Sequence, residues 1–225
     1  MHSFLVSNNY EQPNIKLFRK NDISVSLLKF ENFQYRLCEG ETQWMTYDLN
    51  HRQALEISSH FYLAKGHCIC TGLGFGAREN WVLKKPEVTK LTVLEKNVNI
   101  IEYNRYINPK LMSEIEIINT DADEYIGKCD TLLLDHYEMI EYPKLFKRID
   151  KISKNIKCET LWFWPIERIL LEIASKNKNF KLKDIYKNMI LSNNLQNMPI
   201  LNEQILQTFV RLFQGKDIDA EVAQW

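Results

Sequence analysis

Residues 66–76 read Gly-His-Cys-Ile-Cys-Thr-Gly-Leu-Gly-Phe-Gly, and they are the clearest indication of the fold class. A short apolar run, His67–Thr71, has the length of a buried strand and leads directly into glycines at positions 72, 74 and 76. A helix is expected immediately afterwards, from Ala77 to about Lys84. A strand, a glycine-rich turn and a helix in this order form the first unit of an α/β sheet whose strands run parallel.

The chain beyond this unit repeats the alternation of strands and helices. The second strand is expected at Leu91–Leu94, followed by a helix through Val98, Ile101 and Tyr106. Three further apolar runs predict strands at 115–118, 130–134 and 159–164. Short strands separated by helical stretches imply right-handed crossovers. We therefore expect an α/β fold with a Rossmann-like, doubly wound, mostly parallel sheet.

The segments on either side of this sheet have a different character. Period-two alternation at 23–27 and 33–37, a Glu39-Gly40 turn and a third run through Trp44 and Tyr47 predict a small N-terminal antiparallel β-sheet. Residues 1–20 show no periodicity and are expected to form a loosely attached arm, while 49–64 is expected to be helical. The predicted organisation is a β region at 1–48, a nucleotide-binding domain at 49–165 and a helical C-terminal segment at 166–225 packed on the same core.

Composition narrows the class of protein. The chain has 225 residues, 26% of them charged, and a formal net charge of +0, which gives no sign of a nucleic-acid-binding surface. It contains no apolar run long enough to span a membrane and no signal-peptide pattern, so a cytoplasmic protein is expected. Its five cysteines are expected to be reduced, buried packing residues, and its histidines do not cluster at ligand spacing, so no metal site is expected.

The glycine loop is the first indication of function. Glycines at this position let a cofactor approach the backbone more closely than a Cβ atom would allow. Gly76 follows Gly74 by two residues rather than three, which is typical of S-adenosylmethionine sites and less typical of nicotinamide sites. The alternative interpretation is a tight turn between strand and helix that binds no ligand.

Acidic residues follow the next two strands. Glu95 ends the second strand about 20 residues after the glycine loop, where a carboxylate binds the hydroxyls of a ribose. Asp121 and Ala122 follow the third strand, where Asp121 can accept a hydrogen bond from an adenine amine. Asp121 can also cap a helix running toward Tyr125. Because parallel strands end at one edge of a sheet, these residues and the loop are expected to line one site.

The fourth strand ends in Asp135 and His136, which are the candidate catalytic residues. Either side chain can take a proton from an attacking amine or hydroxyl. The alternative interpretation is that Asp135 caps the following helix and that His136 lies on the surface.

Residues 23–165 together resemble the spermidine synthase-like branch of the class I S-adenosylmethionine-dependent methyltransferase superfamily. The resemblance rests on the glycine loop, on Lys85–Glu95 leading into the second strand, and on Glu39–Gln43 with Asp48 beyond it. It implies that Gln43, Glu95, Asp121 and Asp135 are polar contacts and that the glycines lie under a methionine moiety. The implied cofactor is S-adenosylmethionine or its decarboxylated form.

The sequence departs from the aminopropyltransferases of this branch. Phe75 stands where they carry an aspartate in the glycine loop, and the loss of that acid favours a cofactor with an intact carboxylate. Arg52 and Gln53 replace a tyrosine and a histidine, and Glu138 replaces an aspartate. These departures argue against polyamine synthesis and leave adenosyl binding in place.

Three functions follow in order of preference. The first is a methyltransferase acting on a small-molecule acceptor, and the second is an aminopropyltransferase using Asp135 to deprotonate the attacking amine. The third is a non-catalytic binding module, which the aromatic run 162–165 would support if it were exposed, although such a run is expected to end a buried fifth strand. An NAD-dependent oxidoreductase ranks lower. The apolar positions of 166–225 predict a core face, with a lid or a homodimer contact as the alternatives.

Overall fold

The structure is a computed structural model that describes residues 15–29, 33–48, 57–137, 141–177 and 179–214. Its centre is a five-stranded sheet in the order β11-β9-β5-β6-β7, with every neighbouring pair parallel. The strands are β5 (Gly66–Thr71), β6 (Val88–Leu94), β7 (Glu116–Ile118), β9 (Thr131–Leu134) and β11 (Thr160–Phe163). The predicted Rossmann-like sheet is therefore confirmed.

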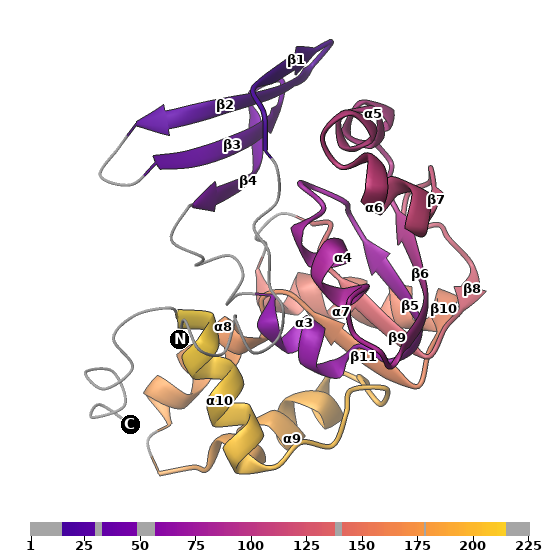
Figure 1. Cartoon of the computed structure of the whole chain (residues 1–225). Coiled ribbons are helices and arrows are strands. Elements are labelled where there is room, and N and C mark those ends of the chain that lie inside the picture. The colour runs from indigo at the N-terminus through magenta and orange to yellow at the C-terminus, as the bar shows by residue number, and fades with distance from the viewer. Residues whose placement is uncertain (1–14, 30–32, 49–56, 138–140, 178, 215–225) are drawn as a thin grey trace.

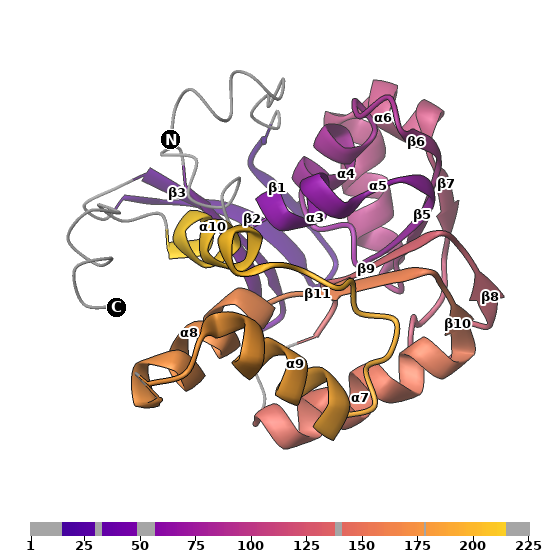
Figure 2. The same ribbon diagram turned by 90° about the horizontal axis from the view of Figure 1, so that it is seen from below.

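Helices cover both faces of this sheet (Figures 1 and 2). On one side lie α3 (Ser58–Leu63), α4 (Ala77–Val82), α5 (Val98–Ile107) and α6 (Pro109–Glu114). On the other lie α7 (Tyr142–Asn155), α8 (Ile166–Lys176) and α9 (Leu182–Ser192). Burial on both faces explains why the four residues of β9 and of β11 are all buried and read as continuous apolar runs.

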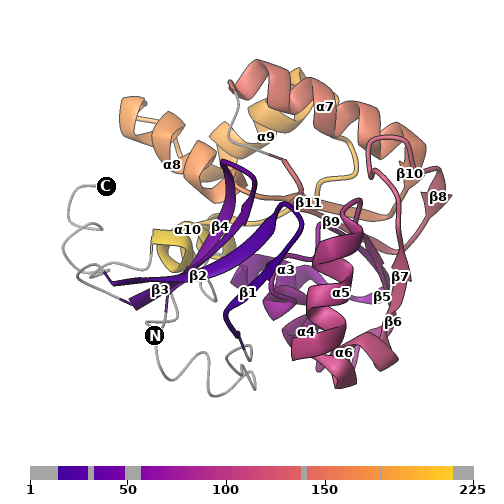
Figure 3. The ribbon, with the colours of Figure 1, turned by 90° about the horizontal axis from the view of Figure 1, so that it is seen from above.

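A second sheet packs beside the first and is antiparallel, with the order β1-β2-β3-β4 (Figure 3). Its strands are β1 (Phe18–Lys20), β2 (Ile23–Lys29), β3 (Phe33–Glu39) and β4 (Thr42–Asp48). β1 lies inside the segment predicted to be a loose arm, so that prediction is wrong for residues 18–20. The Lys16 carbonyl accepts a hydrogen bond of 2.9 Å from Tyr103 Oη of α5, and the Phe18 and Tyr103 rings lie 5.0 Å apart.

Several boundaries also differ from the prediction. The predicted helix at 49–64 is represented by α3, and residues 49–56 lie outside the described part of the chain. The helices α6 and α7 were not predicted, nor was the short parallel pair β8 (Gly127–Lys128) and β10 (Ile156–Lys157). Cys38, Cys68 and Cys70 are buried as expected, whereas Cys129 and Cys158 are only half-buried.

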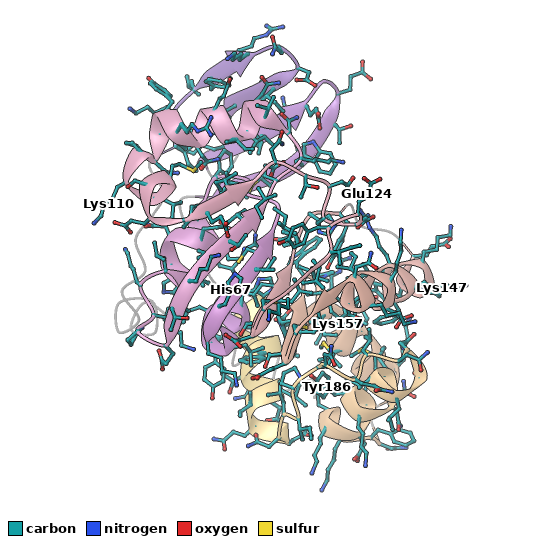
Figure 4. The ribbon with its side chains drawn as sticks, turned by 90° about the vertical axis from the view of Figure 1, so that its right-hand side faces the viewer. His67, Lys110, Glu124, Lys147, Lys157 and Tyr186 are labelled. Carbon is teal, nitrogen blue, oxygen red and sulfur yellow. The ribbon has the colours of Figure 1, made fainter. Side chains whose placement is uncertain are left out.

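The C-terminal helices α8, α9 and α10 (Glu203–Gln214) pack on the same core. Tyr186 of α9, labelled in Figure 4, is buried with its ring 6.3 Å from that of Trp162 on β11. Ile169, Leu170 and Phe209 are buried, so the apolar face of this segment is a core face. Among the described residues there is no helix with the length and apolar character needed to cross a membrane.

Candidate functional site: a cleft at the ends of the parallel strands

The cleft lies where the strand order of the parallel sheet changes direction. β5 is central, the chain continues to β6 and β7 on one side of it, and β9 and β11 lie on the other. Ligands of doubly wound sheets bind at this point, beyond the carboxyl ends of the strands. The cleft encloses about 850 Å³, part of it open solvent, and is lined by residues that follow β5, β6, β7 and β9.

The glycine loop forms the floor of the cleft, with Gly72 and Gly74 among its lining residues. Gly72 has φ +74°, and a Cβ atom there would lie 2.6 Å from the Asp135 carbonyl oxygen. At Gly74 (φ +49°) a Cβ atom would lie 2.6 Å from Met45 Sδ. The backbone oxygen at Gly72 cannot move aside, so this contact requires glycine, whereas at Gly74 the end of the Met45 side chain can shift and the positive φ is what favours glycine. Gly76, with φ +70°, is the N-cap residue that precedes α4 and does not line the cleft.

Glu95 is held at the wall between the ends of β5 and β6. Its Oε2 accepts a hydrogen bond of 2.8 Å from the backbone N–H of Leu73, and its Oε1 accepts one of 2.8 Å from Asn97 N. The side chain is buried, and burial raises the pKa of the carboxyl group, although these two N–H groups oppose the shift. Each carboxylate oxygen keeps acceptor capacity for a ligand hydroxyl.

Asp121 and Ala122 line the same cleft from the loop after β7, beside Thr120. Asp121 Oδ1 accepts a hydrogen bond of 3.0 Å from Asp123 N, and Glu124 N donates one of 3.1 Å to the Asp121 carbonyl. The segment is a turn, so the alternative interpretation of Asp121 as the cap of a helix is wrong. Both of its carboxylate oxygens keep acceptor capacity for a ligand amine.

Asp135 lies at the end of β9, with a side chain 36% exposed in the cleft. It does not cap a helix, because α7 begins only after Glu141. Its backbone N–H donates a hydrogen bond of 3.0 Å to Thr71 Oγ1 at the end of β5. Burial raises the pKa of Asp135 to about 6, which the nearby Arg78 opposes and Glu79 reinforces. The carboxyl group therefore changes its charge near neutral pH.

His136 is held on both sides and is not a surface residue, since its side chain is 11% exposed. Nε2 lies 3.0 Å from Asp123 Oδ1, and because a carboxylate only accepts, this nitrogen carries the proton. Burial lowers the pKa of His136, so the ring is neutral near pH 7, and Nδ1 accepts a hydrogen bond of 2.6 Å from Thr71 Oγ1. Because both ring nitrogens are hydrogen-bonded, His136 links the side chains of Thr71 and Asp123 and holds them in place.

Asp121, Asp123 and His136 also place potential metal ligands within 4.8 Å of one another. Arg148 already supplies a cation there, because its Nε lies 3.1 and 2.9 Å from the two carboxylate oxygens of Asp123. Burial would raise the pKa of Asp123, but hydrogen bonds from His136 and Arg148 outweigh it and hold the pKa below its ordinary value. Asp123 and Arg148 therefore form an ion pair, to which the neutral His136 adds a hydrogen bond.

Sequence reasoning missed the two charged residues that follow the glycine loop, Arg78 and Glu79. Both are buried and both line the cleft. Arg78 Nε donates a hydrogen bond of 2.8 Å to Glu79 Oε1, and Nη2 donates bonds of 3.1 and 2.6 Å to the carbonyls of Thr71 and Gly72. Their position in the sequence could have identified them as cleft residues, because the first turn of a helix after such a loop faces the ends of the strands.

The remaining wall comes from the antiparallel sheet. Glu39 accepts hydrogen bonds of 2.8 Å from Trp44 Nε1 and 2.7 Å from Asn97 Nδ2, which ties this sheet to α5. Lys96 Nζ lies 5.5 Å from the centre of the Trp44 ring. The predicted contact residue Gln43 is exposed on β4 and is not brought together with the others.

Phe75 also lies outside the lining residues. It is 1% exposed, and its ring meets that of Tyr103 edge-on at 6.2 Å. The glycine loop therefore carries no acidic side chain at this position, as the sequence indicated, and the Phe75 side chain itself packs in the core.

No family model and no curated protein matches the chain, but solved structures do. A spermidine synthase from Thermotoga maritima is 16% identical over 67% of this chain and 56% of its own, with a TM-score of 0.46. The mitomycin 7-O-methyltransferase MmcR is 21% identical over 48% of this chain and 33% of its own, with a TM-score of 0.38. The N-methyltransferase NodS from Bradyrhizobium japonicum is 20% identical over 50% of this chain and 63% of its own, with a TM-score of 0.36. The chain spans little more than half of the spermidine synthase. Its own sheet order and cleft carry the functional argument.

Proposed function

We propose that this protein is an S-adenosylmethionine-dependent methyltransferase. The observation that carries the proposal is that the glycine loop, Glu95, Asp121 and Asp135 line one cleft at the carboxyl ends of β5, β6, β7 and β9. In this proposal Glu95 accepts hydrogen bonds from the ribose hydroxyls, and Asp121 with Ala122 contacts the adenine. The sulfonium end of the cofactor then extends toward Asp135.

The reaction in this arrangement is an in-line displacement. The bound cofactor would supply a methyl group on a sulfonium: the acceptor nucleophile would form a bond to the methyl carbon while the carbon–sulfur bond broke and its electron pair stayed on sulfur as a neutral thioether. The protein contributes mainly by holding the reactants in line. Of the two predicted catalytic residues, Asp135 is the better placed to accept the acceptor's proton, because both ring nitrogens of His136 are already hydrogen-bonded.

Aminopropyl transfer is the second candidate, and one observation favours it. Acidic residues outnumber basic ones in the cleft, which suits the additional positive charge of decarboxylated S-adenosylmethionine: they are Glu39, Glu79, Glu95, Asp121 and Asp135 against Arg78 and Lys96. We prefer methyl transfer because Arg78 places a cation beside Asp135 and Phe75 leaves the loop without an acid. The non-catalytic alternative loses its main support, since Trp162 and Phe163 are fully buried.

Calorimetric titration of the full chain with S-adenosylmethionine, and separately with S-adenosylhomocysteine and NADH, tests the proposal. We expect saturable one-to-one binding of the two sulfur nucleosides and none of NADH. A panel of small amines, phenols and thiols, incubated with methyl-labelled cofactor, then identifies the acceptor class. Binding of NADH in preference to both sulfur nucleosides would reject the proposal.

A further inference from the structure

Arg78 reaches the cleft with part of its hydrogen-bonding capacity unused. Its Nε and Nη2 are engaged by Glu79 and by the carbonyls of Thr71 and Gly72. Its Nη1 is buried and has no hydrogen-bond partner among the described residues. The side chain is 6% exposed, so the acceptors on Nε and Nη2 fix the guanidinium in place.

An unmet donor on a buried cation is unfavourable for the fold. A buried donor without a partner costs the desolvation of that group, and a charged donor costs more than a neutral one. A ligand acceptor that forms a hydrogen bond with Nη1 offsets this desolvation free energy on binding. A planar carboxylate is the natural complement of a guanidinium.

Asp135 lies next to this donor but does not form a hydrogen bond with it. Arg78 Nη1 and Asp135 Oδ2 are 3.7 Å apart, beyond the roughly 2.7–2.9 Å of a charge-assisted hydrogen bond. Nη1 and Asp135 therefore form an ion pair without a hydrogen bond, and a donor and an acidic acceptor lie side by side at the cleft. An α-amino acid carries a carboxylate and an ammonium group on one carbon, which is the matching arrangement.

We propose that Arg78 Nη1 binds the α-carboxylate of the methionine end of the cofactor while Asp135 accepts from its ammonium group. This inference rests on the proposed function and names the residue that selects the cofactor. The Arg78, Glu79 and Asp135 side chains sum to one negative charge when ionised, and a bound zwitterion leaves that sum unchanged. Decarboxylated S-adenosylmethionine lacks the carboxylate and leaves Nη1 unmet.

The test compares three nucleosides by calorimetry: S-adenosylmethionine, its decarboxylated form and 5′-methylthioadenosine, which lacks the amino acid altogether. Wild-type protein is expected to prefer the intact cofactor over the decarboxylated one by on the order of tenfold or more. Arg78→Lys, which keeps the charge but loses the planar fork, should reduce this ratio several-fold without changing the affinity for 5′-methylthioadenosine. Lys144→Gln removes an exposed cation of α7 that does not line the cleft and should leave the ratio unchanged.

Thermal unfolding establishes that each variant is folded. If Arg78→Lys is not folded, the double variant Arg78→Met with Glu79→Gln takes its place in the comparison. A wild-type protein that binds the decarboxylated cofactor as tightly as the intact one overturns the inference without any variant. So does an Arg78 variant with an unchanged ratio, and in both cases adenosyl binding still stands. Failure of all three nucleosides to bind overturns this inference and the proposed function together.

Discussion

The Glu95 carboxylate accepts a hydrogen bond from the backbone N–H of Leu73 at 2.8 Å, so the end of β6 is joined directly to the glycine loop after β5. The second oxygen of Glu95 accepts from Asn97 N, which leads into α5. One side chain thereby fixes the position of the loop and presents acceptor oxygens to the cleft. The predicted ribose contact and the shape of the loop depend on the same carboxylate.

Glu95→Gln should weaken binding of S-adenosylmethionine by about 1.5–3 kcal/mol, because the charged acceptor and one of its two oxygens are lost. Calorimetry measures the change. Glu87→Gln makes the same substitution at an exposed position just before β6 and should leave the affinity unchanged. Equal affinities for the two variants would remove Glu95 from the site.

Gly72→Ala should cost clearly more stability than Gly40→Ala. Both glycines have positive φ, +74° and +57°, which costs an alanine about 1–2 kcal/mol. Only at Gly72 does the added Cβ also meet a backbone atom, the Asp135 carbonyl oxygen, whereas nothing lies within 4 Å at Gly40. Urea unfolding measures both, and equal losses of stability would contradict the close contact between the ends of β5 and β9.

His60 should make the fold less stable in mild acid. The ring is 1% exposed, and neither nitrogen has a hydrogen-bond partner among the residues described. Burial, aided by the charge of Arg78, lowers the pKa of His60 well below its ordinary value. The unfolded chain takes up a proton near pH 6.5 while the folded chain does not, so stability falls as the pH falls.

Between pH 7.5 and pH 5.5 this residue alone should remove about 1.4 kcal/mol of stability. His60→Leu should abolish that part of the pH dependence and raise stability at both values, since an unsatisfied buried polar group is removed. Urea unfolding at the two pH values provides the comparison. An identical pH dependence in wild type and variant would show that His60 finds a partner for its proton.

The affinity for S-adenosylmethionine should rise with pH through the titration of Asp135. With a pKa of about 6, this group is mostly protonated at pH 5 and has lost the negative charge that attracts the cofactor's ammonium group. Affinity should therefore fall by up to about tenfold per pH unit below 6 and level off above it. In Asp135→Asn this dependence should disappear; if it persists, another group controls the charge of the cleft.

The same raised pKa has the opposite consequence for the fold itself. The folded chain holds the Asp135 proton to a higher pH than the unfolded chain, whose aspartates titrate near 3.8. The stability that this group contributes is thus present below that value and is lost as the pH rises through 6.

The parallel sheet was predictable because its strands are apolar on both faces and are separated by helices. The strand β1 was not, because its burial pattern offers only one half-buried residue, Phe18, next to two exposed ones. The helix α7 did carry a signal: Pro143 stands in its first turn, and Leu145, Phe146, Ile149 and Ile152 form one buried stripe.

The site was predictable where it depends on the ends of strands, and less so elsewhere. Glu95, Asp121 and Asp135 follow strands that meet at one edge, so the topology alone brings them together. The wall formed by Glu39, Trp44 and Met45 depends on how the antiparallel sheet packs against α5. Successive side chains of a strand face opposite sides of the sheet. The pairing of β3 with β4 shifts register between Leu37 and Cys38, and a shift of one residue turns the other side of the strand inward. The sequence alone therefore does not determine which side of β4 faces the cleft.

The most direct test of the central claim is a calorimetric titration of the full chain with S-adenosylmethionine. The arrangement of the glycine loop, Glu95, Asp121 and Asp135 predicts saturable binding with one site per chain and tighter binding of the intact cofactor than of its decarboxylated form. Saturable binding that favours the decarboxylated form would contradict methyl transfer and support aminopropyl transfer. No binding of either form, by a chain shown to be folded, would contradict the assignment of the cleft as an adenosyl site.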